Sequence, residues 1–199
     1  MSMTLDKSAS MNAVAERLAE HRKLNGLTLE ELARRASLTK SYLSKLERGL
    51  SSPTLATVLK LAEALNVTVD QLISPRREAS AIVVVKSDER APFSRSPDHH
   101  GYIYEAIASE RADKSMMPFV MMPPSQLGDA PMSSHAGEEL IFVVQGEMEV
   151  VFEDRTVHLQ QGDSVYFNAA IPHRARSVGK TQAQALVVVS PRRVDSNVS

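Results

Sequence analysis

Cysteine is absent from this chain of 199 residues, and no long hydrophobic run interrupts it. Without cysteine the protein can form neither a disulfide framework nor a thiolate metal site, so nothing supports a secreted origin. A membrane span needs about 18 consecutive apolar residues, and no run approaches that length. The first twelve residues are polar and lack the apolar core of a signal peptide. We therefore expect a cytoplasmic protein with no membrane partner.

The chain also lacks a strong excess of charge of either sign, since its formal net charge is −1. The first 75 residues carry a small excess of basic side chains, and the remainder carry a small excess of acidic ones. Binding to nucleic acid depends on local patches of charge rather than on the total. The charge distribution is therefore compatible with DNA binding by the first 75 residues but does not by itself indicate it.

The spacing of apolar residues changes near residue 75. Before this point they recur at helical spacing, and after it short β-branched and alternating runs dominate. The polar segment 75–80 separates the two patterns. We predict a multidomain protein of the α + β class, with an all-α, five-helix domain at 10–74, a linker at 75–80 and an all-β domain at 81–192.

The five predicted helices follow from the spacing of apolar residues in the first domain. The first carries Val14, Leu18 and Leu24 on its expected inner face. Thr28 and Glu31 are spaced as a capping box, in which a hydroxyl and a carboxylate each satisfy a backbone N–H at the start of the second helix. The expected ranges are 12–24, 28–36, 40–48, 54–65 and 69–73.

The third predicted helix has the character of a DNA-reading helix. It is capped by Thr39, closed by Gly49 and joined to the second helix by only a few residues. Such a helix can project from the body and enter the major groove. Because caps, tight turn and closing glycine occur together, we favour this interpretation over a helical bundle with a solvated face. The outward side chains, which can donate to bases and phosphates, are Lys40, Ser41, Ser44, Lys45 and Arg48.

Residues 17–72 resemble the phage-repressor and Cro-like helix-turn-helix family, or XRE family. The resemblance is carried by segments 27–33, 39–49 and 52–55, and Ser37 stands where the turn often has glycine. It implies a dimer that reads two half-sites of a double-stranded DNA operator, about 34 Å apart. We expect the second domain to hold the two copies together.

The XRE resemblance also implies individual roles. The start of the third helix reads bases in this family, a role that falls here on Lys40, Ser41 and Lys45. The residues that match phosphate-contacting positions are Thr28, Tyr42 and Ser51. The family also has an ion pair between the first and third helices, and the matching residues are Arg22 and Glu47. The full set of predicted DNA-binding residues is Thr28, Thr39, Lys40, Ser41, Tyr42, Ser44, Lys45 and Arg48.

Nine short strands are predicted in the second domain, separated by turn residues such as Gln145-Gly146. So many short strands in about 120 residues favour a closed or sandwiched antiparallel architecture. The expected ranges are 81–85, 102–107, 117–122, 139–145, 147–152, 156–159, 164–167, 173–177 and 184–189.

Segments 133–146 and 162–173 resemble the two motifs of the cupin family, whose fold is a double-stranded β-helix barrel. In metal-binding cupins three histidines and one glutamate ligate a divalent metal. His135, Glu139 and His173 match three of these ligands, and Ser133 stands in place of the fourth. Two imidazoles and one carboxylate can still bind Zn, Fe or Mn and leave positions open for a substrate.

The same three residues also allow a pocket for an organic ligand without a metal, which we favour slightly over a tightly held metal. A ligand pocket is expected to be apolar with a few polar groups. Phe119, Phe142 and Tyr166 are the candidates to line it.

These patterns predict a dimeric, sequence-specific transcriptional regulator, not an enzyme, that a small-molecule effector or a metal in the barrel modulates. One alternative is a metal-dependent cupin isomerase or dioxygenase that carries a DNA-binding domain, and the missing fourth ligand argues against it. Another is a structural or antitoxin-like module whose β-domain binds a protein partner.

Overall fold

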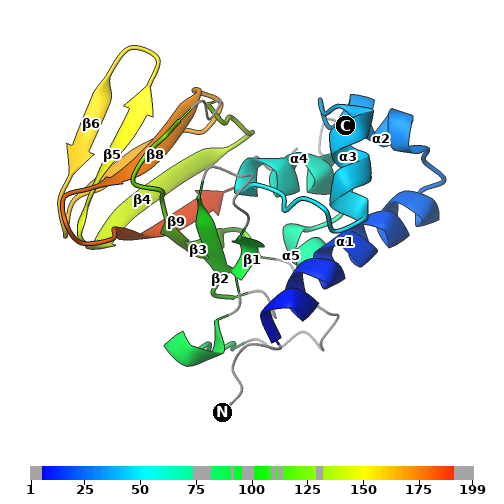
Figure 1. Cartoon of the computed structure of the whole chain (residues 1–199), viewed down its shortest axis with the longest axis horizontal. Helices are drawn as coiled ribbons and strands as arrows, with labels where there is room; N and C mark the ends of the chain where they lie inside the picture. Colours follow the sequence, from blue (N-terminus) through cyan, green and yellow to red (C-terminus); the bar gives the residue numbers. More distant parts are fainter. Residues whose placement is uncertain are drawn as a thin grey trace, which may run out of the picture.

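The computed structural model describes residues 6–73, 82–90, 92–95, 101–108, 111, 114–128 and 132–190. Helices form the first part of the chain and strands form the second (Figure 1), which confirms the predicted α + β class. The predicted linker lies outside the described residues, so the domain limits stay predictions. Within the described part, no helix has the length and apolar character needed to cross a membrane.

Five helices make up the first part, as predicted. Leu24 was expected inside but is 74% exposed. It lies six residues after the buried Leu18, which turns it about 240° around the helix axis and away from the inner face. The helices are α1 (Asp6–Leu24), α2 (Leu29–Arg35), α3 (Lys40–Glu47), α4 (Leu55–Leu65) and α5 (Val69–Ile73).

Threonine caps fix where three of these helices begin. At α2, the Thr28 hydroxyl accepts from the Glu31 N–H at 3.2 Å, and the Glu31 carboxylate accepts from the Thr28 N–H at 2.7 Å. This is the predicted capping box. Thr39 and Thr54 cap α3 and α4 through their hydroxyls. Ser37 has a φ of 54° in the turn between α2 and α3, which explains why glycine is common at this position.

A partly buried ion pair joins α1 to α3. Arg22 donates from Nε to Glu47 Oε1 at 2.6 Å and from Nη2 to Glu47 Oε2 at 2.9 Å. The third guanidinium nitrogen donates to the Leu27 carbonyl at 2.8 Å. The two side chains are only 13% and 10% exposed, and the geometry confirms the pair that the XRE resemblance implied.

Removing one partner of this pair should destabilise the helical domain. We expect Glu47→Ala to lower the free energy of unfolding by about 3 kcal/mol, because Arg22 would keep a partly buried charge without its carboxylate. Glu30→Ala is the matched control, since Glu30 forms a solvent-exposed pair with Lys40, and it should lower the same quantity by less than about 1 kcal/mol. Urea unfolding followed by the helical circular dichroism signal measures both, and equal losses would contradict this assignment.

The second part forms two antiparallel sheets that face each other as a barrel (Figure 1). One sheet has the order β1-β2-β3-β9-β4-β7 and the other has the order β6-β5-β8. The strands are β1 (Pro92–Arg95), β2 (Ile103–Ala106), β3 (Met117–Met122), β4 (Glu138–Gln145), β5 (Glu147–Phe152), β6 (Thr156–Leu159), β7 (Ser164–Asn168), β8 (His173–Val178) and β9 (Gln184–Ser190).

The start of this part differs from the prediction. No strand forms over residues 82–85, where Ile82 and Val84 are 79% and 75% exposed, so the strand predicted at 81–85 is wrong. The described residues of this run belong to neither sheet and lead into a short 3-10 helix, Ser87–Glu89. The first strand is instead β1, at the sheet edge beside β2, where a proline such as Pro92 is tolerated.

Alternation along β4 decides which residues face the barrel interior. Glu139, Ile141 and Val143 are buried, whereas Phe142 and Val144 between and beyond them are exposed. Successive side chains of a strand point to opposite faces of the sheet. A carboxylate at 139 therefore projects into the barrel, among apolar side chains of the core.

A partly buried ion pair also links the two parts of the molecule. The ammonium of Lys114, in the loop before β3, contacts the carboxylate of Asp70 on α5, and the two side chains are 9% and 12% exposed. Burial raises the pKa of Asp70, while Lys114 opposes that change. The pair helps to hold the helical part against the barrel, with α4 toward the sheets (Figure 1).

Candidate functional site

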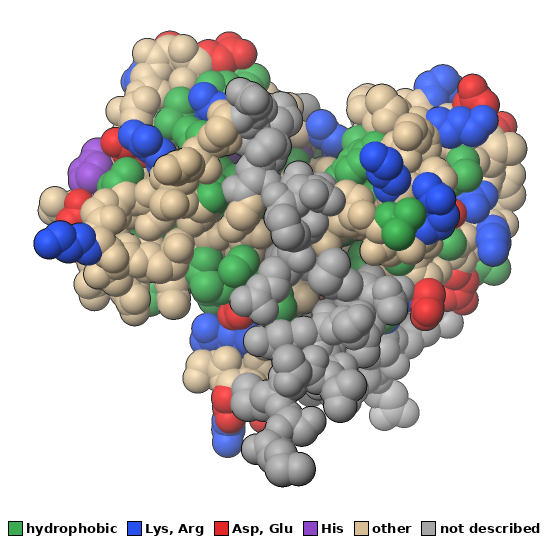
Figure 2. Space-filling model, viewed as in Figure 1, with side chains coloured by type: hydrophobic (Ala, Val, Ile, Leu, Met, Phe, Trp, Pro, Cys, Tyr) green, Lys and Arg blue, Asp and Glu red, His purple; other side chains and the backbone are tan. Residues whose placement is uncertain are grey.

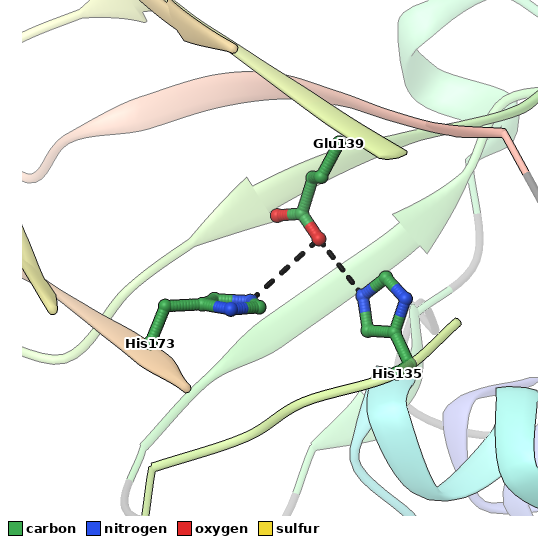
Figure 3. A group of neighbouring side chains, drawn as sticks. All are labelled: His135, Glu139 and His173. Atoms are coloured by element: carbon green, nitrogen blue, oxygen red, sulfur yellow. Dashed lines mark hydrogen bonds and ion pairs between the residues drawn. The ribbon is translucent and has the colours of Figure 1, made fainter. Parts of the chain in front are cut away.

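Three titratable side chains meet inside the barrel (Figure 3). His135 comes from the segment before β4, Glu139 from β4 and His173 from the start of β8. The distance from Glu139 Oε2 is 2.9 Å to His135 Nε2 and 3.7 Å to His173 Nε2. All three are buried, and one ligand atom from each lies within 4.8 Å of the others. The structure thus brings together the three residues that the sequence pattern predicted as metal ligands.

Backbone pairing holds the two cupin-like segments together at this point. Ser133 and His173 exchange N–H to carbonyl hydrogen bonds of 2.8 and 3.0 Å, and the His135 N–H donates to the Ala169 carbonyl at 3.0 Å. This pairing places residues from distant parts of the chain around one point. Ser133, which replaces the fourth ligand, lines the adjoining cavity.

The hydrogen bonds of the two imidazoles fix which nitrogen faces Glu139. His173 Nδ1 lies 2.8 Å from the Ile171 carbonyl, and His135 Nδ1 lies 3.2 Å from the Ala136 carbonyl. A carbonyl only accepts, so each Nδ1 donates to its carbonyl and each Nε2 is the nitrogen that faces Glu139. In the contact with the carboxylate the Nε2 of His135 is the donor, and it could ligate a metal only after losing that proton. Burial lowers the pKa of His173 and favours its neutral, ligating form.

The three ligand atoms suit a divalent cation. Two imidazole nitrogens and a carboxylate oxygen converge, and a cation between them would take the place of the proton that His135 shares with Glu139. Ligand atoms on a metal with bonds of about 2.1 Å lie about 3.0 Å apart at right angles. The observed separations of 2.9 and 3.7 Å are close to this spacing. The residues present therefore suit a metal ion with three protein ligands.

The cluster opens into a cavity of about 590 Å³ that the barrel and the helices line together. Its barrel wall includes Tyr102, whose hydroxyl accepts from the Ala175 N–H at 2.6 Å. Burial raises the pKa of Tyr102 to about 12, so the phenol stays neutral. The lining residues from the barrel are Tyr102, Tyr104, Met121, Met132, Ser133, His135, Glu139, Ile141, His173, Arg174 and Ala175, and those from the helical part are Leu38, Tyr42, Lys45, Leu50, Ser51, Thr54, Leu55, Ala56, Thr57 and Lys60.

The three aromatic residues predicted to line a pocket lie elsewhere. Phe119 is 2% exposed and packs in the barrel core, outside the cavity lining. Phe142 and Tyr166 are 40% and 62% exposed on the outer face of the large sheet, so this prediction is wrong for both. An inward Glu139 already requires Phe142, three residues on, to face outward. The same alternation could have identified Ile141 as a lining residue.

The residues predicted to contact DNA lie mostly on the surface of α2 and α3. Thr28, Thr39, Lys40, Ser41, Lys45 and Arg48 are exposed, and Ser44 is half-buried. On the opposite side of α3, Leu43 and Leu46 are buried, as predicted. Figure 2 shows Lys and Arg side chains gathered over the helical part of the molecule. The outer side of α3 is therefore accessible to a large partner.

Tyr42 differs from the other members of this set. Its side chain is half-buried, bonds to Thr57 of α4 and lines the cavity. Desolvation raises the pKa of its phenol, so Tyr42 remains neutral. The sequence placed it among phosphate contacts, whereas its position suits the wall between α3 and the barrel.

Comparison with known proteins agrees with both parts of the fold. A helix-turn-helix family model matches residues 18–72, and a cupin domain model matches residues 118–189. The HTH-type transcriptional regulator PuuR of Escherichia coli is 27% identical over 184 residues, which are 89% of this chain and 93% of that regulator. The HTH-type transcriptional regulator y4dJ of Sinorhizobium fredii is 42% identical over 65 residues, which are 33% of this chain and 84% of y4dJ.

A solved structure extends this likeness across the whole molecule. The crystal structure of an HTH_3 family transcriptional regulator from Vibrio cholerae has a TM-score of 0.68 and 28% sequence identity to this chain. The match covers 94% of this chain and 99% of that protein. The likeness to known regulators thus extends over both parts of the chain. The chain belongs to the XRE-type helix-turn-helix family of transcriptional regulators and carries a cupin domain as its second part.

Proposed function

We propose that this protein acts in the cytoplasm as a dimer that binds a specific double-stranded DNA operator, and that a small ligand or a divalent metal in the cupin domain modulates this binding. One observation carries the proposal: the cavity beside the His135–Glu139–His173 cluster is walled on its other side by α3. An occupant of the barrel therefore lies next to the helix that reads DNA.

The α3 surface supplies the groups that base reading needs. Lys40, Ser41 and Lys45 are exposed near its start and along its outer side. Lysine and serine donate to base edges and phosphates in the major groove. Thr28, Thr39, Ser44 and Arg48 surround them and support the same function.

The cupin cluster supports a divalent metal as part of the sensor. When bound, a metal such as Zn, Fe or Mn would supply a positive charge and open coordination positions for an effector. His135, Glu139 and His173 would hold it, and the Nδ1 hydrogen bonds of the histidines would orient the rings.

The outer face of the large sheet supports dimer formation. Phe142 and Val144 of β4 and Tyr166 of β7 are 40%, 48% and 62% exposed on one side of neighbouring strands. Large apolar residues grouped on a surface mark interaction sites. Two helix-turn-helix domains must also be held together to read two half-sites. A second copy of this chain would cover the exposed apolar residues and also hold two helix-turn-helix domains together.

The substitution Phe142→Glu tests the dimer and its role in DNA binding. We expect the variant to be monomeric in analytical ultracentrifugation, because two carboxylates would have to be buried in a symmetric interface. We also expect its operator affinity to fall at least about 100-fold, because each half-site would be bound alone. Leu24→Glu introduces the same charge at an exposed leucine of α1 and should stay dimeric. A dimeric Phe142→Glu variant would exclude this face as the interface.

The alternative function, a metal-dependent enzyme, is supported by the His135–Glu139–His173 cluster and the cavity beside it. PuuR and the Vibrio cholerae protein, which match most of the chain, are transcriptional regulators, and this favours the regulator. An enzyme would turn over a substrate in the absence of DNA, whereas a sensor would bind its ligand and change operator affinity.

A further inference from the structure

The cavity described above lies between two domains rather than within one. Its barrel side is formed by the His135–Glu139–His173 cluster and its surroundings, and its helical side is formed by α3, α4 and the loop between them. A volume of about 590 Å³ is in the range of sites that enclose a small metabolite. A molecule that fills it would contact the sensor domain and the DNA-binding domain at once.

The charged side chains around this cavity are mainly cationic. Lys45 of α3, Lys60 of α4 and Arg174 of β8 line it, whereas Glu139 is the one carboxylate among the described lining residues. Glu139 is already paired with His135, and a metal at the cluster would add further positive charge. A partly enclosed site with this balance favours a negatively charged molecule.

Hydroxyl groups line the same cavity as the lysines. Ser51, in the loop before α4, and Thr54, at its cap, are among the lining residues. Hydroxyls and ammonium groups together are the donors that carboxylate and phosphate oxygens use in proteins. The apolar part of the wall, which includes Met121 and Ile141, would cover a short carbon chain.

Lys45 belongs to two surfaces. It is an exposed residue on the DNA-reading helix, and it also lines the cavity. One ammonium group cannot hold a DNA phosphate or base and an anionic ligand in the same geometry. A ligand anion near α3 would also repel the phosphates of a bound duplex.

We propose that the cavity binds a small anion, a carboxylate or a phosphate, between the barrel cluster and the lysines Lys45 and Lys60, and that this anion and operator DNA compete for Lys45. The competition rests on the proposed role of α3 in DNA binding. Because the coupling between two ligands is reciprocal, the anion lowers operator affinity by the same factor as the operator lowers anion affinity.

Direct binding is tested by titration calorimetry on the full chain. The probes are succinate, inorganic phosphate and 1,4-diaminobutane, a dication with the same number of carbon atoms as succinate. We expect one of the two anions to bind and the diamine not to bind, and the tighter anion identifies the ligand as a carboxylate or a phosphate. Lys45→Gln and Lys60→Gln should each weaken anion binding at least about tenfold, whereas Lys180→Gln, in an exposed turn of the barrel, should not.

Competition is tested by fluorescence anisotropy with a labelled operator duplex. KCl is adjusted to hold the ionic strength constant, since DNA binding depends strongly on salt. We expect the anion to weaken operator binding at least about tenfold in the wild type. In the same titration, Lys60→Gln should need at least about tenfold more anion for the same relative loss of operator affinity, measured against the affinity of this variant without anion.

The outcomes separate this inference from the proposed function. Three results would overturn the anion site: binding of the diamine, binding of neither anion, or an anion affinity in Lys45→Gln and Lys60→Gln that equals that of the wild type. Anion binding with unchanged operator affinity overturns the competition. A chain that binds the anion at these lysines but selects no DNA sequence supports the anion site and overturns both the competition and the proposed regulator.

Discussion

Lys45→Ala and Lys40→Ala are each expected to weaken operator binding by at least about 30-fold. A good side-chain contact to a base edge contributes about 1 to 3 kcal/mol to discrimination. In a dimer each substitution removes the contact from both half-sites, so about 2 to 6 kcal/mol is lost, and 1.4 kcal/mol corresponds to a tenfold change. Both lysines lie on the exposed side of α3, and neither belongs to its buried side.

Fluorescence anisotropy at one fixed salt concentration measures this loss. Lys180→Ala is the matched control, because Lys180 is an exposed lysine in the turn between β8 and β9. A residue that contacts a base should also change the preferred sequence, whereas one that contacts a phosphate should weaken all sequences alike and reduce the dependence on salt. If both α3 variants bind the operator as tightly as the control, α3 is not the recognition helix.

Glu139→Gln is expected to lower the affinity of the barrel for a divalent metal by at least about 100-fold. The amide keeps the shape of the side chain but loses the negative charge that balances the cation, and carboxylate is one of only three protein ligands at this cluster. His135→Ala should have an effect of similar size. Wild-type protein purified without chelator should hold about one equivalent of Zn, Fe or Mn.

Elemental analysis and titration of the metal-free protein measure this effect. Glu138→Gln is the matched control, since Glu138 precedes Glu139 in β4 but is exposed on the other face of the sheet. The control should bind the metal as the wild type does. A wild type with no affinity for any of the three metals would leave the cluster as part of an organic pocket, which contradicts the metal assignment.

Local chemistry explains why most of the fold could be predicted. Thr28, Thr39 and Thr54 cap helices through hydrogen bonds to the backbone three residues on. Because these interactions are local, the start of each helix can be predicted from the neighbouring sequence. The β1 strand was missed because it is short and contains Pro92, a residue type that is rare inside strands. Ile82 and Val84 have strand-like character, but a strand also needs a neighbour to pair with, which the sequence alone does not supply.

The candidate site could be predicted in part for a similar reason. His135, Glu139 and His173 belong to two motifs of fixed spacing, so the resemblance identified them before their meeting point was known. Phe142 and Tyr166 were assigned to the pocket by residue type, although strand alternation determines which face they occupy. The contribution of Lys45 and Lys60 depends on how two domains pack, and no local pattern encodes that contact.

Selection of bound duplexes from a random library tests the central claim most directly. The purified chain should enrich an inverted repeat whose half-sites are centred about 10 base pairs apart, or a multiple of that spacing. The Lys40→Ala, Lys45→Ala double variant should lose this enrichment. Recovery of the starting library by the wild type, or of the same repeat by the double variant, would contradict the account of α3 as the helix that reads DNA.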